Sequence, residues 1–211
     1  MRKASKASAI EQAILDVGFR HSITRRFDIL RDTSATAAIE FGMVGVLIIL
    51  LVVETMQAGL YFYTAASLEF ATNKAARQIL TGAVSSQGLT AAQFRTQVLC
   101  PLLPAAMSCS SVITNLRTVA EDVYPNGFYA FVKTDQSGIN QPTMDNTQTS
   151  FCPGAAGAYV YLQVFYAMPV VSPTWKIVAS TLWNGSAVHF VGAASAFENE
   201  PFQGNTAPGG C

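Results

Sequence analysis

The sequence predicts an α+β protein in which a long N-terminal helix, part transmembrane and part amphipathic, packs on a small, mostly antiparallel sheet. An apolar run extends from Gly42 to Tyr63, and no proline interrupts the chain between Ser34 and Gly82. From Val112 onward the apolar residues alternate with a period of two, which is typical of strands. A long helix followed by a series of strands gives an α+β layout, with the helix as one layer of the domain.

The helix is predicted to begin near Thr33 or Ser34, since either side chain can cap it. At about 1.5 Å per residue, the apolar segment 41–63 is long enough to cross the roughly 30 Å hydrocarbon core of a membrane. Beyond it, apolar residues recur at helical spacing and predict a stripe that docks on the domain: Leu68, Ala71, Ala75 and Ile79. Gly82 is the stop signal.

Charge is unevenly distributed although the chain carries 13 basic and 13 acidic residues and a formal net charge of zero. No basic surface argues for nucleic acid as a partner. Seven basic residues precede the apolar segment: Arg2, Lys3, Lys6, Arg20, Arg25, Arg26 and Arg31. The positive-inside rule then places the N-terminus in the cytoplasm and the domain outside. The expected organisation is a basic cytoplasmic leader (1–35), the long helix (36–81) with its span at about 41–63, and a periplasmic α+β domain (82–211).

The leader does not match an ordinary secretory signal, because its charged portion is long and no A-x-A-like site follows the apolar region. Apolar residues from Ile10 to Val17 fall at i, i+3, i+4 and i+7. They indicate either a short amphipathic helix on the inner leaflet or a weakly structured tail.

Cysteine usage also indicates an external domain. All four cysteines lie after the apolar segment, and no C-x-x-C pair suggests zinc or a redox dithiol. In an oxidising compartment the expectation is two disulfides, with three possible connectivities. The first choice is Cys100 with Cys109 and Cys152 with Cys211, because Cys100 and Cys109 are close in sequence.

The outer domain is predicted to contain a short helix, a hairpin, a long loop and two further strands. The expected elements are a helix over 89–98 capped by Thr90, a strand at 112–119 paired through the turn 125–127 with 128–132, a loop over 134–150, a central strand at 159–168, an Asn184-Gly185 turn and a last strand at 187–197. The segment 175–183 is ambiguous between helix and strand.

Catalysis has little support in the sequence. The two histidines are His21, in the leader, and His189, in a predicted strand, so they supply neither a His-based triad nor a metal cluster in the outer domain. Glu121 and Asp122 are adjacent and would point to opposite faces of a strand. The glycines of 154–157 precede a strand instead of a helix, unlike a phosphate-binding loop. We therefore expect no enzyme activity and no cofactor.

Carboxylates along the long helix are the informative residues. Glu40, Glu54 and Glu69 project within about 60° of one another at 3.6 residues per turn. A carboxylate within a membrane costs on the order of a few kcal/mol and usually faces protein or water. Either these residues face protein or water on one side of the helix, or Glu40 and Glu69 sit at the two interfaces and only Glu54 is buried.

The motif Thr36-Ala37-Ala38-Ile39-Glu40-Phe41, followed by Gly-Met-Val-Gly-Val-Leu-Ile, resembles the start of TadE-like proteins, the minor pilins or pseudopilins of the tight-adherence pilus system. The ending Phe197-Glu198-Asn199-Glu200-Pro201-Phe202 resembles the Phe-Arg-Asn-Glu-Pro-Phe ending of that family. The extended helix, the paired-cysteine loop and the central strand extend this resemblance over most of residues 30–202. It implies a pilin-like fold.

The resemblance also implies roles for individual residues. A prepilin peptidase would cut between Ala35 and Thr36, and Glu40 would pair with the new α-amino group of a neighbouring subunit. Glu40, Phe41 and Glu54 are then the expected assembly residues. Two positions depart from the family pattern: Ala35 replaces the usual glycine at the cleavage site, and Glu198 replaces an arginine.

Together these features predict a minor pilin-like or pseudopilin-like subunit in biogenesis of a tight-adherence (Flp-type) pilus. It would be a single-pass inner-membrane protein whose partners are the membrane, other pilin and pilus-assembly subunits and a prepilin peptidase. Whether it enters the fibre or only initiates it is left open, and a pseudopilin of a general secretion system is a close relative of this hypothesis. The alternative is a monomeric, membrane-anchored periplasmic binding or sensor domain that keeps its leader.

Overall fold

The computed structural model of the 211-residue chain describes residues 33–119 and 127–202. The chain divides into two compact units, with the division between Val53 and Glu54. The leader segment Ile10 to Val17, the pair Glu121-Asp122 and Cys211 lie outside the described residues.

Helix α2 (Thr33–Leu80) is the longest element, at 48 residues. It contains both predicted cap residues, Thr33 and Ser34, and ends two residues before Gly82, whose φ of 75° lies in the left-handed region. Glycine adopts this conformation without a Cβ penalty, so Gly82 ends the helix as predicted.

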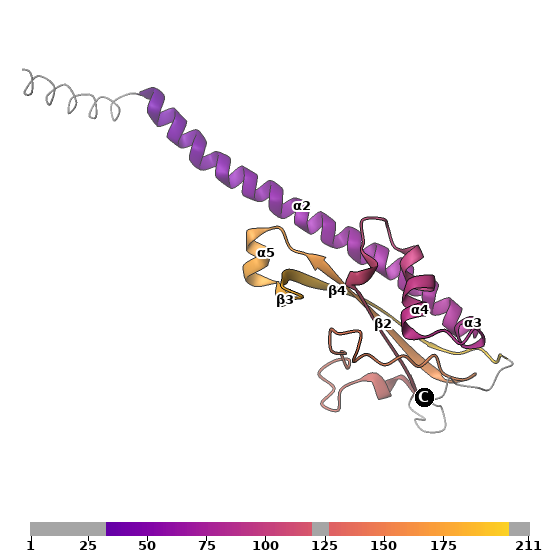
Figure 1. Cartoon of the computed structure of the whole chain (residues 1–211). Coiled ribbons are helices and arrows are strands. Elements are labelled where there is room, and N and C mark those ends of the chain that lie inside the picture. The colour runs from indigo at the N-terminus through magenta and orange to yellow at the C-terminus, as the bar shows by residue number, and fades with distance from the viewer. Residues whose placement is uncertain (1–32, 120–126, 203–211) are drawn as a thin grey trace, which may run out of the picture. The chain divides into compact units, whose positions relative to one another are not determined.

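The sheet has four strands in the order β1-β2-β4-β3, and every pairing is antiparallel (Figure 1). The strands are β1 (Val112–Val119), β2 (Tyr159–Pro169), β3 (Thr181–Trp183) and β4 (Ser186–Glu198). The predicted central strand is β2, which pairs with β1 on one side and β4 on the other. Asn184 and Gly185, both with positive φ, form the tight turn between β3 and β4.

The predicted hairpin between 112–119 and 128–132 is wrong. Strand β1 pairs with β2 instead, from Val112 opposite Tyr166 to Val119 opposite Tyr159. Residues Gly127–Phe131 form the 3-10 helix η4. The rings of Phe128 and Phe131, three residues apart and therefore on one side of a 3-10 turn, pack on Tyr159 and Tyr161 of β2. Burial of the Phe131 ring and the contact of Phe128 with Tyr159 outweigh the strand-like composition of the segment.

Short helices connect the long elements. They are α3 (Ala83–Ser86), α4 (Ala91–Gln93), the π-helical turn η1 (Phe94–Leu99), the 3-10 turns η2 (Cys100–Leu102) and η3 (Cys109–Ser111), and α5 (Pro173–Val178). Thr90 caps the predicted 89–98 helix through a capping box with Gln93. The ambiguous 175–183 segment divides between α5 and β3.

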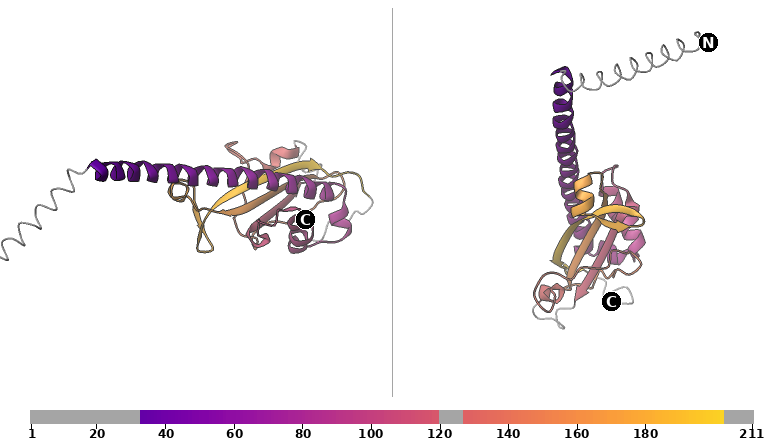
Figure 2. Two further views of the ribbon diagram at one scale, coloured as in Figure 1. Left: turned by 90° about the horizontal axis from the view of Figure 1, so that it is seen from above. Right: turned by 90° about the vertical axis from the view of Figure 1, so that its left-hand side faces the viewer.

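The core lies between the C-terminal part of α2 and one face of the sheet (Figure 2). The predicted stripe of Leu68, Ala71, Ala75 and Ile79 is fully buried. It belongs to the same apolar cluster as alternate residues of β2, which include Val160, Leu162 and Val164. This packing confirms the predicted α+β layout, with the outer part of the helix as one layer.

Candidate membrane and assembly helix

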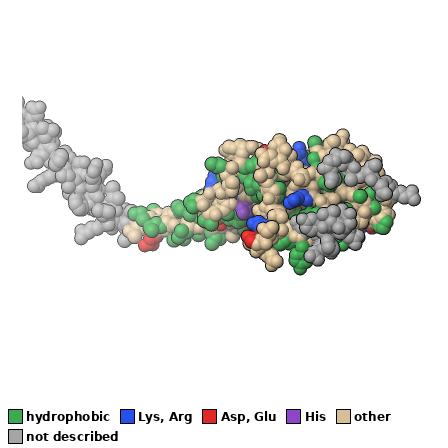
Figure 3. All heavy atoms as spheres, turned by 90° about the horizontal axis from the view of Figure 1, so that it is seen from below, with side chains coloured by type: hydrophobic (Ala, Val, Ile, Leu, Met, Phe, Trp, Pro, Cys, Tyr) green, Lys and Arg blue, Asp and Glu red, His purple; other side chains and the backbone are tan. Residues whose placement is uncertain are grey.

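The N-terminal part of α2 exposes large apolar side chains, and Figure 3 shows those on one face of the helix. Between Ile39 and Val52, each Ile, Leu, Val, Met and Phe is at least 39% exposed. Consecutive helical residues point about 100° apart, so this exposure leaves no polar face. Within the described residues, one helix, Thr36–Leu80, is long and apolar enough to cross a membrane. This stretch can anchor the chain in a bilayer.

The predicted processing and assembly residues lie in the first turns of α2. The peptide bond between Ala35 and Thr36 is inside the helix, which starts at Thr33. Thr36 and Glu40 are both exposed and are four residues apart, so they share one helix face. Phe41 is 79% exposed. Glu40 and Phe41 are thus accessible to another chain, while their roles and the cleavage stay predictions.

Glu54 has a partner in its own chain. Ser172 donates a hydrogen bond from its Oγ to Glu54 Oε1 at 2.5 Å. One turn later, the side chain of Gln57 is buried, and its Oε1 accepts bonds from the backbone N–H groups of Val171 (2.9 Å) and Ser172 (3.4 Å). Glu54 and Gln57, two of the polar residues that interrupt the apolar run, therefore hold the loop that leads into α5.

The domain also covers the next turn of this helix face. Tyr61 packs its ring against Trp175 of α5 and His189 of β4, with centroids 5.6 Å apart in both pairs. The predicted span 41–63 therefore overlaps, from Glu54 onward, with a face of α2 that packs on the protein. The sequence patterns do not single out Ser172 and Trp175 as partners of this helix face. A Ser-Pro pair that opens a helix, here Ser172 as the cap and Pro173 in the first turn, could have located α5.

His189 has a packing role in the structure. Its ring packs edge-on against those of Tyr61 and Trp175, and its Nδ1 is 2.7 Å from the backbone oxygen of Ala179. Among the residues that the structure describes, no cluster of three or more His, Cys, Asp or Glu side chains could hold a metal ion.

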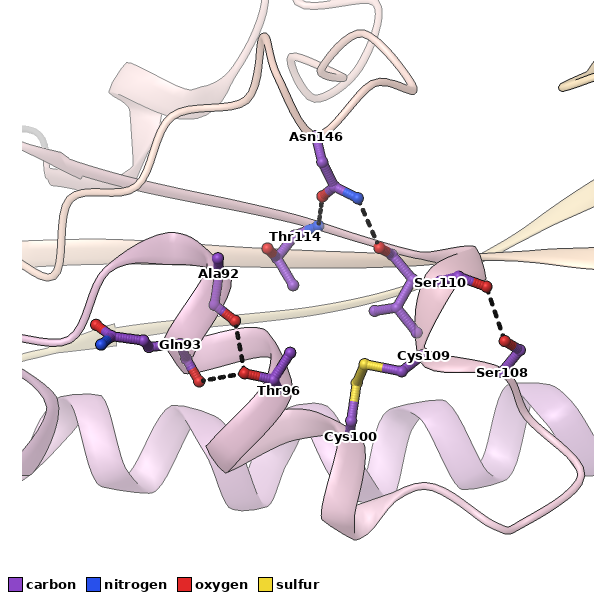
Figure 4. Close-up of a disulfide and its surroundings, with 10 residues drawn as sticks. Ala92, Gln93, Thr96, Cys100, Ser108, Cys109, Ser110, Thr114 and Asn146 are labelled. Atoms are coloured by element: carbon purple, nitrogen blue, oxygen red, sulfur yellow. Dashed lines mark hydrogen bonds between the residues drawn. A yellow bond between two sulfur atoms is a disulfide. The ribbon is translucent and has the colours of Figure 1, made fainter.

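The disulfide between Cys100 and Cys109 confirms the first predicted pair (Figure 4). It joins the start of η2 to the start of η3, with Cα atoms 5.6 Å apart, immediately before β1. Beside it, Asn146 accepts a hydrogen bond from the N–H of Thr114 and donates one to the oxygen of Val112, which fixes the 134–150 loop on β1. Cys152 is also disulfide-bonded. Its predicted pairing with Cys211 remains a prediction.

The family-like ending connects β4 to the C-terminus of α2. Asn199 is 2% exposed, and its Nδ2 donates to the backbone oxygens of Pro153 (2.8 Å) and Ala155 (2.9 Å). The N–H of Glu200 donates to the oxygen of Leu80, one of the last carbonyls of α2. The ring of Phe202 lies so close to Gly82 that a Cβ there would come within 2.5 Å of it.

The contacts of this ending come from the Asn199 side chain, the Glu200 backbone and the Phe202 ring. Glu198, the residue that departs from the family pattern, is exposed. The charge reversal at Glu198 therefore leaves the connection to α2 intact.

Residues 35–77 match the family model described as "TadE-like protein". The comparisons with curated proteins and with solved structures found no match. The matched stretch carries Glu40, Phe41 and Glu54 and three of the four buried stripe residues, Leu68, Ala71 and Ala75. The resemblance to TadE-like proteins is therefore confirmed over residues 35–77, which form nearly all of α2.

Proposed function

We propose that the chain is a minor pilin-like or pseudopilin-like subunit in biogenesis of a tight-adherence (Flp-type) pilus. It is a single-pass inner-membrane protein with its leader (1–35) in the cytoplasm and its domain (82–211) in the periplasm. Its work is non-covalent and consists of helix packing in the membrane and subunit assembly. The TadE-like match of residues 35–77 supports involvement in pilus assembly.

One observation carries this proposal: Glu40 is an exposed carboxylate at the start of a helix stretch that is apolar all round. A lone charge in or beside hydrocarbon is costly and usually marks a functional contact. A neighbouring subunit cut between Ala35 and Thr36 would offer a new α-amino group as the partner of this carboxylate. Because removing one member of such a pair leaves the other uncompensated, the pair favours one stagger between adjacent helices.

The experiment replaces Glu40 with alanine or with the uncharged, similarly shaped glutamine. Both variants should insert in the membrane at the normal level but abolish surface pili and adherence. Glu69→Ala is the matched control, because Glu69 is also an exposed carboxylate of α2 but follows the apolar stretch. Electron microscopy of pili and an adherence assay provide the measurements. Normal pili in Glu40→Gln would refute the proposed role.

The hydrogen bond between Ser172 and Glu54 favours a second candidate function, a monomeric membrane-anchored binding or sensor domain. In this case Glu54 serves the chain's own fold instead of an assembly contact. The two functions predict different mature proteins. Intact-mass measurement of protein purified from membranes should give a chain that starts at Thr36 for the pilin-like subunit and one that starts at Met1 for the monomeric anchor.

A further inference from the structure

A second apolar surface lies in the outer unit, on the segment 171–182, which we name the α5 corner. It contains the end of the loop after β2, helix α5 and the first residues of β3. Four of its large apolar side chains point to solvent: Val171 (66% exposed), Ile177 (86%), Val178 (80%) and Leu182 (79%). Adjacent exposed apolar side chains of this kind mark contact surfaces more often than ordinary protein surface.

The position of the α5 corner along α2 indicates what covers it. The corner is attached to the first turn of the outer unit by the bonds of Val171 and Ser172 to Gln57 and of Ser172 to Glu54. Glu54 directly follows Val53, where the uninterrupted apolar stretch ends. Counted from Thr36, and so with Glu40 inside it, the segment up to Val53 has 18 residues, or about 27 Å of helix, close to the thickness of a hydrocarbon core. The corner is thus attached to α2 at the residues that directly follow the candidate membrane segment.

The side chains and backbone of the α5 corner suit a lipid interface. Lys176 is exposed between Trp175 and Ile177, and a cation beside apolar side chains can reach lipid phosphates while the others enter the acyl boundary. The backbone donors that the structure pairs here include those of Lys176, bonded to Ser172, and Ala179, bonded to Trp175. Because these N–H groups are already hydrogen-bonded within the chain, moving them from water into the lipid interface costs less free energy.

We propose that the α5 corner rests in the outer interface of the bilayer, with Ile177, Val178 and Leu182 in the headgroup and acyl boundary. The hydrocarbon-spanning part of α2 then ends near Val53 and not at Tyr63. This inference depends on α2 being a membrane anchor and is independent of a role in pili. It accounts for polar residues at Glu54 and Gln57, which hold the corner at the membrane surface.

The test places a photo-reactive diazirine amino acid at Ile177 or at Leu182 in the full chain, reconstituted in vesicles of phosphatidylethanolamine and phosphatidylglycerol. The matched control position is Tyr129, which is 74% exposed. Its helix η4 packs on Tyr159, at the opposite end of β2 from Pro169 and the corner. Formation of the Cys100–Cys109 disulfide, checked by mass, confirms that each variant is folded.

After irradiation, lipid adducts at positions 177 and 182 should exceed those at position 129 at least several-fold by mass spectrometry. Adducts that join two copies of the chain at position 177 would overturn the proposal and assign the corner to a protein interface. Labelling by water at all three positions would also overturn it. Either result would leave the pilus role untouched, because that role is tested through Glu40.

Discussion

The two parts of α2, before and after Val53, belong to one helix but satisfy their apolar side chains in different ways. From Ile39 to Val52 the large apolar side chains are exposed on all sides. From Leu68 to Ile79 a single stripe is completely buried on the chain's own sheet, while residues such as Glu69 and Lys74 point to solvent. A 3.6-residue stripe thus completes its packing within one chain, whereas an apolar surface all round requires lipid or another protein.

The stability of the outer unit and the anchoring in the membrane therefore depend on different parts of one helix. Substitutions after Val53 should act on unfolding of the outer unit. Substitutions before it should act on insertion and on contacts with other chains.

The largest effect on stability is expected from Leu68→Ala. Leu68 is fully buried in the core cluster, so its truncation loses apolar burial and leaves a cavity. The free energy of unfolding should fall by about 2–5 kcal/mol. Guanidinium unfolding of the detergent-solubilised chain, followed by tryptophan fluorescence, measures it, because both tryptophans lie in the outer unit.

Leu47→Ala is the matched control for Leu68→Ala. Leu47 is 67% exposed in the apolar part of the same helix, so the same truncation should leave the unfolding midpoint unchanged. Equal losses in the two variants would erase the distinction between the two parts of α2.

The sequence revealed the features that depend on local periodicity or turn chemistry. Burial of the 68–79 stripe, the centrality of β2 and the Asn184-Gly185 turn all follow from patterns a few residues long. Strand pairing does not, because alternation shows which side chains face a core but not which strand lies alongside. For this reason the sequence predicts a pairing of β1 with residues 128–132, whereas β1 pairs with β2.

The candidate site shows the same limit at longer range. Glu54 and Ser172 are 118 positions apart, so the sequence alone showed a costly carboxylate without its hydrogen-bond partner. The sequence likewise does not reveal the contacts of Asn199 and Phe202, although it shows the family-like ending that contains both residues. Thr36, Glu40 and Phe41 could be singled out because their motif is contiguous.

A loss of stability that approaches that of Leu68→Ala is expected from Gly82→Ala at the C-terminus of α2. The new Cβ would meet the Phe202 ring at 2.5 Å, and alanine would be held at a φ of 75°. Left-handed strain costs about 1–2 kcal/mol and overpacking about 1–3 kcal/mol more. The same unfolding assay measures the sum of the two costs and so locates where the packed part of α2 ends.

Gly88→Ala separates these two contributions. Gly88 also has a positive φ, of 60°, but nothing lies within 4 Å of its Cβ position. This variant should show the left-handed strain alone, and Phe202→Ala in the Gly82→Ala background should recover part of the difference. If Gly82→Ala and Gly88→Ala unfold at the same midpoint, Phe202 does not pack at the end of α2.

The smallest effect is expected from lowering the pH. It should destabilise the outer unit slightly and leave the apolar part of α2 unchanged. In the 134–150 loop, a hydrogen bond from the Thr147 N–H at 2.9 Å lowers the pKa of Asp145 from its ordinary value. A lowered folded-state pKa means that the carboxylate stabilises the fold above its unfolded pKa, near 3.9, and loses that contribution as pH falls through the lower folded value. Asp145→Asn should therefore reduce the acid sensitivity of the unfolding midpoint slightly below pH 4.

Residues 41–53 contain no titratable side chain. Their helical circular dichroism should therefore persist in detergent over the same pH range. A parallel loss of that signal would show that the two parts of α2 unfold together.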